Sequence, residues 1–133
     1  MHLQSRYKHY PFSARRVNSV IDMALNNRNT YGSVLLHEGE PVGFMLMILD
    51  YLLASEVRIA SEVCLYVQPA HRSYKAFAAL MHEAEEWCRD QDARILGVGT
   101  NGPIDEYVAG RMGKLYRHRG FSNAGGIYHK ELV

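Results

Sequence analysis

The residues best suited to chemistry lie in the second half of the chain, at the start of a predicted helix. Pro69-Ala70-His71-Arg72-Ser73 follows an apolar strand pattern and leads into helical spacing. A helix N-terminus exposes unpaired N–H groups and a partial positive charge, so it attracts phosphate. Arg72 adds a fork that can hold two phosphate oxygens, and Ser73 and Lys75 add further donors. The segment therefore predicts an anion site, with simple capping of a solvated helix as the alternative.

Histidines and cysteines give no comparable signal. None of the seven histidines forms an i,i+4 pair or a Cys/His knuckle, so no metal site is expected. Cys64 lies in a predicted strand and Cys88 in a predicted helix. This placement favours two buried thiols over a disulfide.

Length and charge set the class of protein. The 133 residues suit one domain, and a hydrophobic content of 47% is enough for a core. Lys and Arg number 15 against 14 Asp and Glu, which leaves a formal charge of +1. Nucleic-acid binders usually carry a basic stripe, so we expect no nucleic-acid partner.

The chain shows no membrane or export signal. Its N-terminus lacks the apolar segment of a secretory signal peptide. The most apolar run, Val42 to Ala54, spans 13 residues and contains Asp50. A bilayer-crossing helix needs about 20 apolar residues. We therefore expect a cytoplasmic protein with no membrane partner.

Hydrophobic periodicity predicts one domain over residues 1–133, in the order helix, three strands, helix, strand, helix, strand. Helices are expected over about 14–27, 71–91 and 104–118, and strands over 33–37, 42–53, 57–67, 94–99 and 127–132. The first three strands form an antiparallel meander. The strands on either side of the second helix should be parallel. The fold class is α/β, an α+β mixed sheet with helices on both faces.

This order resembles the GNAT family of N-acetyltransferases. The family's pyrophosphate loop reads Arg or Gln, two residues, Gly, one residue, then Gly or Ala. Arg72 takes the first position, with Pro69 three residues earlier, and Leu115-Tyr116-Arg117-His118-Arg119-Gly120-Phe121 matches the family's helix end. The resemblance covers about 57–132. It implies a GNAT-like fold, a meander followed by a β-α-β-α-β unit, and small stand-alone bacterial or phage proteins look most similar.

The resemblance implies that acetyl-CoA binds along the strand end and the helix start, with the backbones of Leu65 and Val67 pairing with pantetheine. The expected cofactor-binding residues are Leu65, Tyr66, Val67, His71, Arg72, Ser73, Tyr74, Lys75, Ala76, Phe77 and Asn101. Three positions depart from the family. Lys75 and Phe77 stand at its Gly and Gly/Ala positions, and Ala109 stands where an Asn is frequent.

Two catalytic roles are implied by the same resemblance. Tyr116 would protonate the departing CoA thiolate, and a phenol suits this because it is neutral at pH 7. The alternative for Tyr116 is a core aromatic. Glu62, expected to face opposite to Val63 and Leu65, would be the base that deprotonates the acceptor ammonium. The alternative for Glu62 is a solvated or salt-bridged residue, and the rival bases are Tyr66, Glu56 and His71.

The resemblance thus implies an N-acyltransferase that moves an acetyl group from acetyl-CoA to a primary amine by direct attack. The acceptor is a small molecule or a protein lysine or N-terminus, selected by loops at about 26–32 and 50–57. A homodimer is left open. The alternative is an inactive GNAT-like scaffold for protein binding or virion assembly, which the residues Lys75, Phe77 and Ala109 favour.

Overall fold

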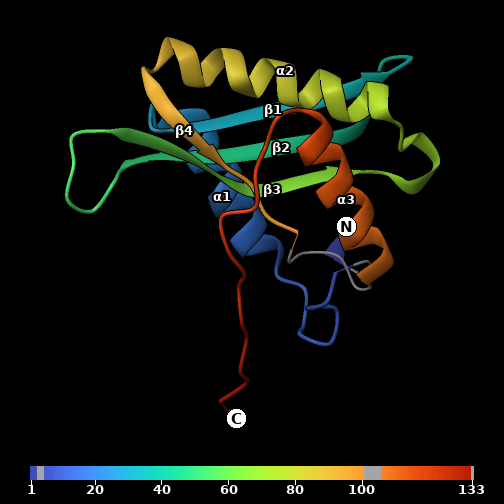
Figure 1. The fold of residues 1–133 in the computed structure, drawn as a ribbon. Helices are drawn as coiled ribbons and strands as arrows, with labels where there is room; N and C mark the ends of the chain where they lie inside the picture. Colours follow the sequence, from blue (N-terminus) through green and yellow to red (C-terminus); the bar gives the residue numbers. More distant parts are fainter. Residues whose placement is uncertain (3–4, 101–105, 133) are drawn as a thin grey trace.

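The computed structural model describes residues 1–2, 5–100 and 106–132. Its elements are α1 (Ala14–Asn26), β1 (Thr30–His37), β2 (Glu40–Tyr51), β3 (Arg58–Val67), the 3-10 turn η2 (Pro69–His71), α2 (Tyr74–Asp90), β4 (Ala93–Gly97) and α3 (Glu106–His118). The strands form a sheet in the order β1-β2-β3-β4 (Figure 1). The first three are antiparallel, and β4 runs parallel to β3. The predicted mixed sheet, with a meander followed by a strand–helix–strand unit, is confirmed.

Neighbouring residues of β1 show that α1 and α2 cover opposite faces of the sheet. The ring of Tyr31 lies 5.2 Å from that of Trp87 on α2. A Cβ on the next residue, Gly32, would lie 3.3 Å from the Cβ of Ala24 on α1. Successive strand residues point to opposite faces. Helices on both faces are therefore confirmed, and Gly32 lets α1 approach the sheet closely (Figure 1).

The core lies between the sheet and α2. Met45 and Met47 of β2 and Met81 of α2 are fully buried there. The periodic apolar face that predicted α2 is the face that is buried, with Phe77, Leu80, Met81, Ala84 and Cys88 inward. The chain just after α3 is tied to α2, because Arg119 Nε and Nη2 donate to the two carboxylate oxygens of Glu85 at 2.7 and 3.1 Å.

The start of α2 differs from the expectation. The helix begins at Tyr74 rather than at residue 71. Ser73 is its N-cap, because its hydroxyl accepts a hydrogen bond from the Ala76 N–H at 3.0 Å. Pro69 to His71 form the separate turn η2. The helical period alone did not distinguish this turn from the first turn of the helix.

The strand expected over 127–132 is wrong. Residues 121–132 contain no strand or helix, and the segment runs away from the sheet (Figure 1). The Phe121 N–H donates to the Tyr116 carbonyl and its ring packs on the Tyr116 ring, which fixes where the segment leaves the body. An alternating pattern states which residues share a face but does not supply a neighbouring strand. The remaining boundaries lie within three residues of those expected.

We expect Met81→Ala to lower the free energy of unfolding by about 2–5 kcal/mol, because it leaves a cavity in the fully buried core. Urea denaturation measures the change. His82→Ala, on the exposed side of the same helix, is the control and should change stability by less than about 0.5 kcal/mol. Equal effects from the two substitutions would contradict this description of the core.

Candidate functional site

The pairing between β3 and β4 ends before β3 does. The parallel ladder runs from Arg58 opposite Ala93 to Ser61 opposite Gly97. Beyond Ser61, β3 continues to Val67 and remains paired with β2 on its other side. Among the described residues, no strand pairs with the β4 side of this second half of β3. The two strands thus part next to Glu62, and we call this place the strand junction.

A β-bulge sets the direction of the Glu62 side chain. Met47 lies opposite Glu62, and Leu46 lies opposite Cys64, so Val63 is an extra residue on β3. Met45, opposite Leu65, and Met47 are both buried in the core. Glu62 and Leu65 therefore share the core face. The expectation that Glu62 faces opposite to Leu65 is wrong, because it assumed a strand of unbroken period two.

The Glu62 carboxylate links the two strands where their own pairing has stopped. Its Oε2 accepts a hydrogen bond from the Gly99 backbone N–H, just after β4, at 3.0 Å. Burial raises the pKa of Glu62 above its ordinary value, and backbone hydrogen bonds from Gly99 and Leu65 oppose that rise. Within the residues that the structure describes, Glu62 forms no salt bridge, and its side chain is only partly exposed. It is a part-buried carboxylate whose proton affinity is increased.

Tyr116 meets the same residue from α3. The side chain is buried, and its hydroxyl donates to the Gly99 carbonyl at 3.2 Å. Its ring lies 5.6 Å from the rings of both Phe77 and Phe121. Burial, and then the negative charge of Glu62, raise the pKa of Tyr116, so the phenol stays protonated at neutral pH. Glu62 and Tyr116, far apart in sequence, thus meet at opposite polar groups of Gly99.

Cys64 lies close to this pair but is not activated. Burial, followed by the charge of Glu62, raises the pKa of its thiol to about 11. A thiol with that pKa is protonated at neutral pH and is a weak nucleophile. Cys64 and Cys88 are both free, as the sequence predicted, but Cys88 is buried whereas Cys64 is only partly buried, so the expectation of two buried thiols holds for Cys88 alone. Burial likewise raises the pKa of Cys88 to about 11.

The sequence predicted that Arg72 lies at the start of the helix, and the structure shows that it does not. It precedes the N-cap Ser73, and its Nε donates to the Val67 carbonyl at 2.9 Å. Its guanidinium also lies over the Tyr66 ring, 5.8 Å from the centroid. Arg72 therefore ties the end of β3 to the turn before α2, and it brings a positive charge to this edge of the site.

Most of the other predicted cofactor residues lie either around the start of α2 or against the core. His71, Ser73, Tyr74, Lys75 and Ala76 surround the start of α2, where the carbonyl of Ser73 also accepts from the Phe77 N–H. The rings of His71 and His37 contact each other in a tilted arrangement, with centroids 4.8 Å apart. Phe77 is a buried core residue, and its ring also contacts Tyr74. Leu65 and Val67 are half-buried against the core. Asn101 lies outside the described residues.

Sequence reasoning missed Gly99 because it acts only through its backbone. It was assigned to the expected strand 94–99, whereas β4 ends at Gly97. Its N–H and carbonyl serve Glu62 and Tyr116 instead of a neighbouring strand. The only available signal was the short spacing of Gly97 and Gly99 at a strand end, which is also typical of an ordinary turn.

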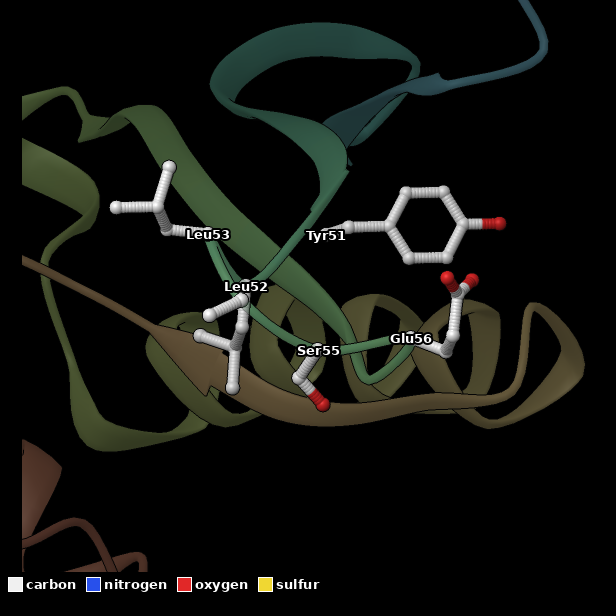
Figure 2. Close-up of a pocket in the computed structure, with 6 residues that line it drawn as sticks. Tyr51, Leu52, Leu53, Ser55 and Glu56 are labelled. Carbon is white, nitrogen blue, oxygen red and sulfur yellow. The ribbon is translucent and has the colours of Figure 1, made fainter.

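A hollow on the β2–β3 hairpin lies away from these residues. It is lined by residues 51–56, within the loop expected to select the acceptor (Figure 2). Figure 2 shows the side chains of Tyr51 and Glu56 on one side of the loop and those of Leu52 and Leu53 on the other. The hollow lies at the opposite end of β3 from η2 and contains none of the predicted site residues.

The described residues contain neither a metal-binding cluster nor a membrane-spanning helix. Residues 1–2, 5–100 and 106–132 contain no group of three or more His, Cys, Asp or Glu side chains that could hold a metal. Within the same ranges, no helix is long and apolar enough to cross a membrane.

Comparison with solved structures places the chain among acetyltransferase folds. It superposes on AAC(6')-Iy in complex with the bisubstrate analogue CoA-S-monomethyl-acetylneamine, with a TM-score of 0.74, 14% identity and coverage of 99% of this chain and 90% of that one. The aminoglycoside 6'-N-acetyltransferase AAC(6')-IG from Acinetobacter haemolyticus superposes with a TM-score of 0.69 at 17% identity, and the match covers 96% of this chain and 88% of that one. A transcriptional regulator from Bacillus halodurans C-125 superposes with a TM-score of 0.74 at 16% identity, and the match covers 92% of this chain and 78% of that one. At these identities the similarity is one of fold.

Sequence comparison identifies the family. No curated protein matches the chain significantly. The family model described as the Acetyltransferase (GNAT) family matches residues 1–121, which is most of the chain. With the fold and the strand junction already described, the match leads to one conclusion: the chain belongs to the GNAT acetyltransferase family.

Proposed function

We propose that this protein is an acetyl-CoA-dependent N-acetyltransferase that acetylates a primary amine by direct attack. One observation carries the proposal: Glu62 and Tyr116 meet at Gly99, where β3 and β4 stop pairing. This arrangement gives a carboxylate of raised proton affinity and a neutral phenol side by side. Amide formation from a thioester needs both functions, one to accept a proton and one to donate a proton.

The proposed reaction uses both groups. Glu62 accepts a proton from the acceptor ammonium, which frees the nitrogen lone pair. The nitrogen attacks the thioester carbonyl carbon, the new C–N bond forms, and the C–S bond breaks. Tyr116 gives its hydroxyl proton to the departing thiolate, and the second proton leaving the attacking nitrogen passes to the resulting phenolate, while Glu62 releases its proton to solvent. Each group must exchange its hydrogen bond with Gly99 for one with the substrate when the substrate enters.

The start of α2 is the proposed place for the CoA phosphates. Because Ser73 already accepts from the N–H groups of Ala76 and Phe77, the N–H groups of Tyr74 and Lys75 are the ones assigned to phosphate. Lys75, at a position where the family has glycine, adds an ammonium group. Arg72 adds positive charge nearby. The second half of β3, from Val63 to Val67, would receive the pantetheine arm along its β4 side.

The acceptor is proposed only as a class. Several structural neighbours act on aminoglycosides according to their names, which supports an amine acceptor. Their low sequence identity leaves a small polyamine and a protein amine as equal proposals. The loop over residues 50–57, which forms the hollow, is the proposed place of acceptor selection (Figure 2).

Acetyl-CoA should raise the melting temperature of the protein. A ligand that binds only the folded state adds about 2.7 kcal/mol of stability at 100 times its dissociation constant. Differential scanning fluorimetry over a range up to millimolar acetyl-CoA measures the shift. ADP is the control for binding of the nucleotide part alone and should give a smaller shift. An unchanged melting temperature throughout the acetyl-CoA range would contradict the proposed function.

Arg72→Ala should weaken acetyl-CoA binding by about 1.5–3 kcal/mol, the range for a hydrogen bond to a charged group. Isothermal titration calorimetry measures the affinity. Arg15→Ala, on the exposed surface of α1, is the matched control and should leave affinity unchanged. Because Arg72 also holds the Val67 carbonyl, urea denaturation of the same variant must show that it remains folded. Unchanged affinity in folded Arg72→Ala would remove this residue from the phosphate site.

Tyr116→Phe should slow acetyl transfer by about 10²–10⁴-fold, because the general acid is lost while the buried ring is kept. Acetyl-CoA affinity should be unchanged. The lost hydrogen bond to Gly99 should cost only about 1 kcal/mol of folding stability. Tyr31→Phe makes the same change in a half-buried tyrosine of β1 and should leave turnover intact. Full turnover in Tyr116→Phe would leave the residue with a packing role alone.

Glu62 should set the acid limb of the pH–rate profile at a pH above the ordinary 4.5 of a glutamate, because burial raises its pKa. Glu62→Gln should abolish that limb and lower turnover. The raised pKa also has a consequence for folding. Rising pH ionises Glu62 in the unfolded chain before the folded one, which favours unfolding.

Glu62→Gln should therefore gain stability relative to the original protein as the pH rises from about 4 to 7. Urea denaturation at several pH values measures the difference. Glu83→Gln, at an exposed position of α2, is the control and should show no such trend. A difference that is constant across this pH range would mean that Glu62 has no raised pKa.

A further inference from the structure

The end of α3 carries Tyr116, but little of the helix itself is buried. Tyr116 is the one buried residue within α3, all of whose residues the structure describes. Regions with little buried apolar surface open at a low cost in free energy. The last turn of α3 lies beside α2, where the Phe77 ring meets the Tyr116 ring at 5.6 Å (Figure 1). Contacts between these two helices therefore decide where the Tyr116 hydroxyl lies.

Arg119, just after α3, forms an ion pair with Glu85 of α2. Its Nε and Nη2 donate to the two carboxylate oxygens at 2.7 and 3.1 Å, a paired geometry that fixes orientation as well as distance. The two side chains are only 19% and 21% exposed, so solvent screens this pair less than an open surface pair. Desolvation offsets much of the attraction in such a pair. Its main effect is therefore expected on the position of the helix end rather than on stability.

The backbone between Tyr116 and Arg119 transmits this position. The Phe121 N–H donates to the Tyr116 carbonyl, and the Gly120 N–H donates to the Arg117 carbonyl, both at 3.0 Å. Gly120 has a φ of +97°, the left-handed conformation that ends a helix in this pattern. Arg119 thus belongs to a closed, hydrogen-bonded helix end that includes the Tyr116 backbone. A displacement of Arg119 should therefore move Tyr116 with it.

The reaction itself creates the need for this contact. In the free protein the Tyr116 hydroxyl donates to the Gly99 carbonyl. The proposed transfer requires the hydroxyl to leave that carbonyl for the CoA sulfur, so the hydrogen bond that holds it is lost when it acts. The ion pair between Arg119 and Glu85 involves no reacting group. It can therefore hold the end of α3 throughout the reaction.

We propose that Arg119, held by Glu85, is a positioning residue for acetyl transfer, which keeps the Tyr116 hydroxyl within reach of the CoA sulfur. This role rests on the proposed acetyltransferase function. Arg119 acts only through the end of α3 and contacts neither the acetyl group nor the attacking amine. A misplacement of about 1 Å at a reacting group can cost about 10²-fold in rate. Loss of the ion pair should therefore slow transfer without weakening acetyl-CoA binding.

Steady-state kinetics of Arg119→Ala test the proposal. Release of the CoA thiol from acetyl-CoA is measured with spermidine, neamine and a lysine peptide as acceptors. We expect kcat to fall by about 10–10²-fold, while acetyl-CoA affinity measured by calorimetry is unchanged. Glu85→Gln removes the charge of the pair but keeps its shape, so it should lower kcat too, and it replaces Arg119→Ala if that variant does not fold. Arg117→Ala, at an exposed position of α3, is the control and should retain full kcat.

Substitution of Tyr116 separates positioning from a general effect on the fold. Tyr116→Phe lacks the hydroxyl, so adding Arg119→Ala to it should lower the remaining turnover no further. An equal loss in both backgrounds, or full kcat in folded Arg119→Ala, would overturn the proposal.

Hydrogen exchange followed by mass spectrometry provides a readout that needs no acceptor. Amides of residues 116–121 should exchange faster in Arg119→Ala than in the original protein, because the end of α3 is released. Arg117→Ala should leave that exchange unchanged. An original protein that does not bind acetyl-CoA would contradict the proposed function itself. Binding of acetyl-CoA together with unchanged exchange in Arg119→Ala would overturn only the role of Arg119.

Discussion

The hydrogen bond from the Gly99 N–H to the Glu62 carboxylate is the interaction on which the candidate site depends. It lies where the ladder between β3 and β4 ends, so it replaces backbone pairing with a side chain. It joins the residue just after β4 to β3 at the first position of β3 that has no ladder partner on that side. The Gly99 carbonyl then receives the hydroxyl of Tyr116, which positions α3 against the same point. Two strands and one helix are thereby held at a single glycine.

The chemistry of the site follows from where this interaction lies. The bulge at Val63 turns Glu62 toward the core face, and burial there raises its pKa. The same burial, together with the charge of Glu62, keeps Tyr116 protonated. A proton acceptor and a proton donor with suitable ionisation states can therefore lie next to each other. The neighbouring thiol of Cys64 is excluded as a nucleophile by the same environment, because its pKa is raised to about 11.

Much of the fold could be predicted from the sequence because it depends on local periodicity. The apolar stripe of α2 and the alternation in β2 and β3 fix which faces are buried, and the order of elements fixes the parallel pairing of β3 with β4. Family resemblance also named Glu62 and Tyr116 as catalytic candidates, and both side chains bond to Gly99. Their meeting could not be predicted, because it depends on a bulge that interrupts the strand period and on the backbone of Gly99.

The errors also have physical causes. Arg72 was placed on the helix because Pro69 and His71 can begin one, whereas the Ser73 hydroxyl is the better cap. The strand at 127–132 was expected from its alternation, but a strand exists only where an edge is within reach. The alternation gave no information on whether any sheet edge lies within reach of the segment, and residues 121–132 contain no strand.

The central claim is that Glu62 and Tyr116 act on a thioester placed at the strand junction. A crystal structure of the protein with bound CoA tests it most directly, through the distance from the Tyr116 hydroxyl oxygen to the CoA sulfur. We expect the two atoms within hydrogen-bond reach, with the pantetheine arm along the second half of β3 and the pyrophosphate at the start of α2. A CoA molecule bound elsewhere, or a sulfur atom remote from a Tyr116 that still donates to Gly99, would contradict the claim.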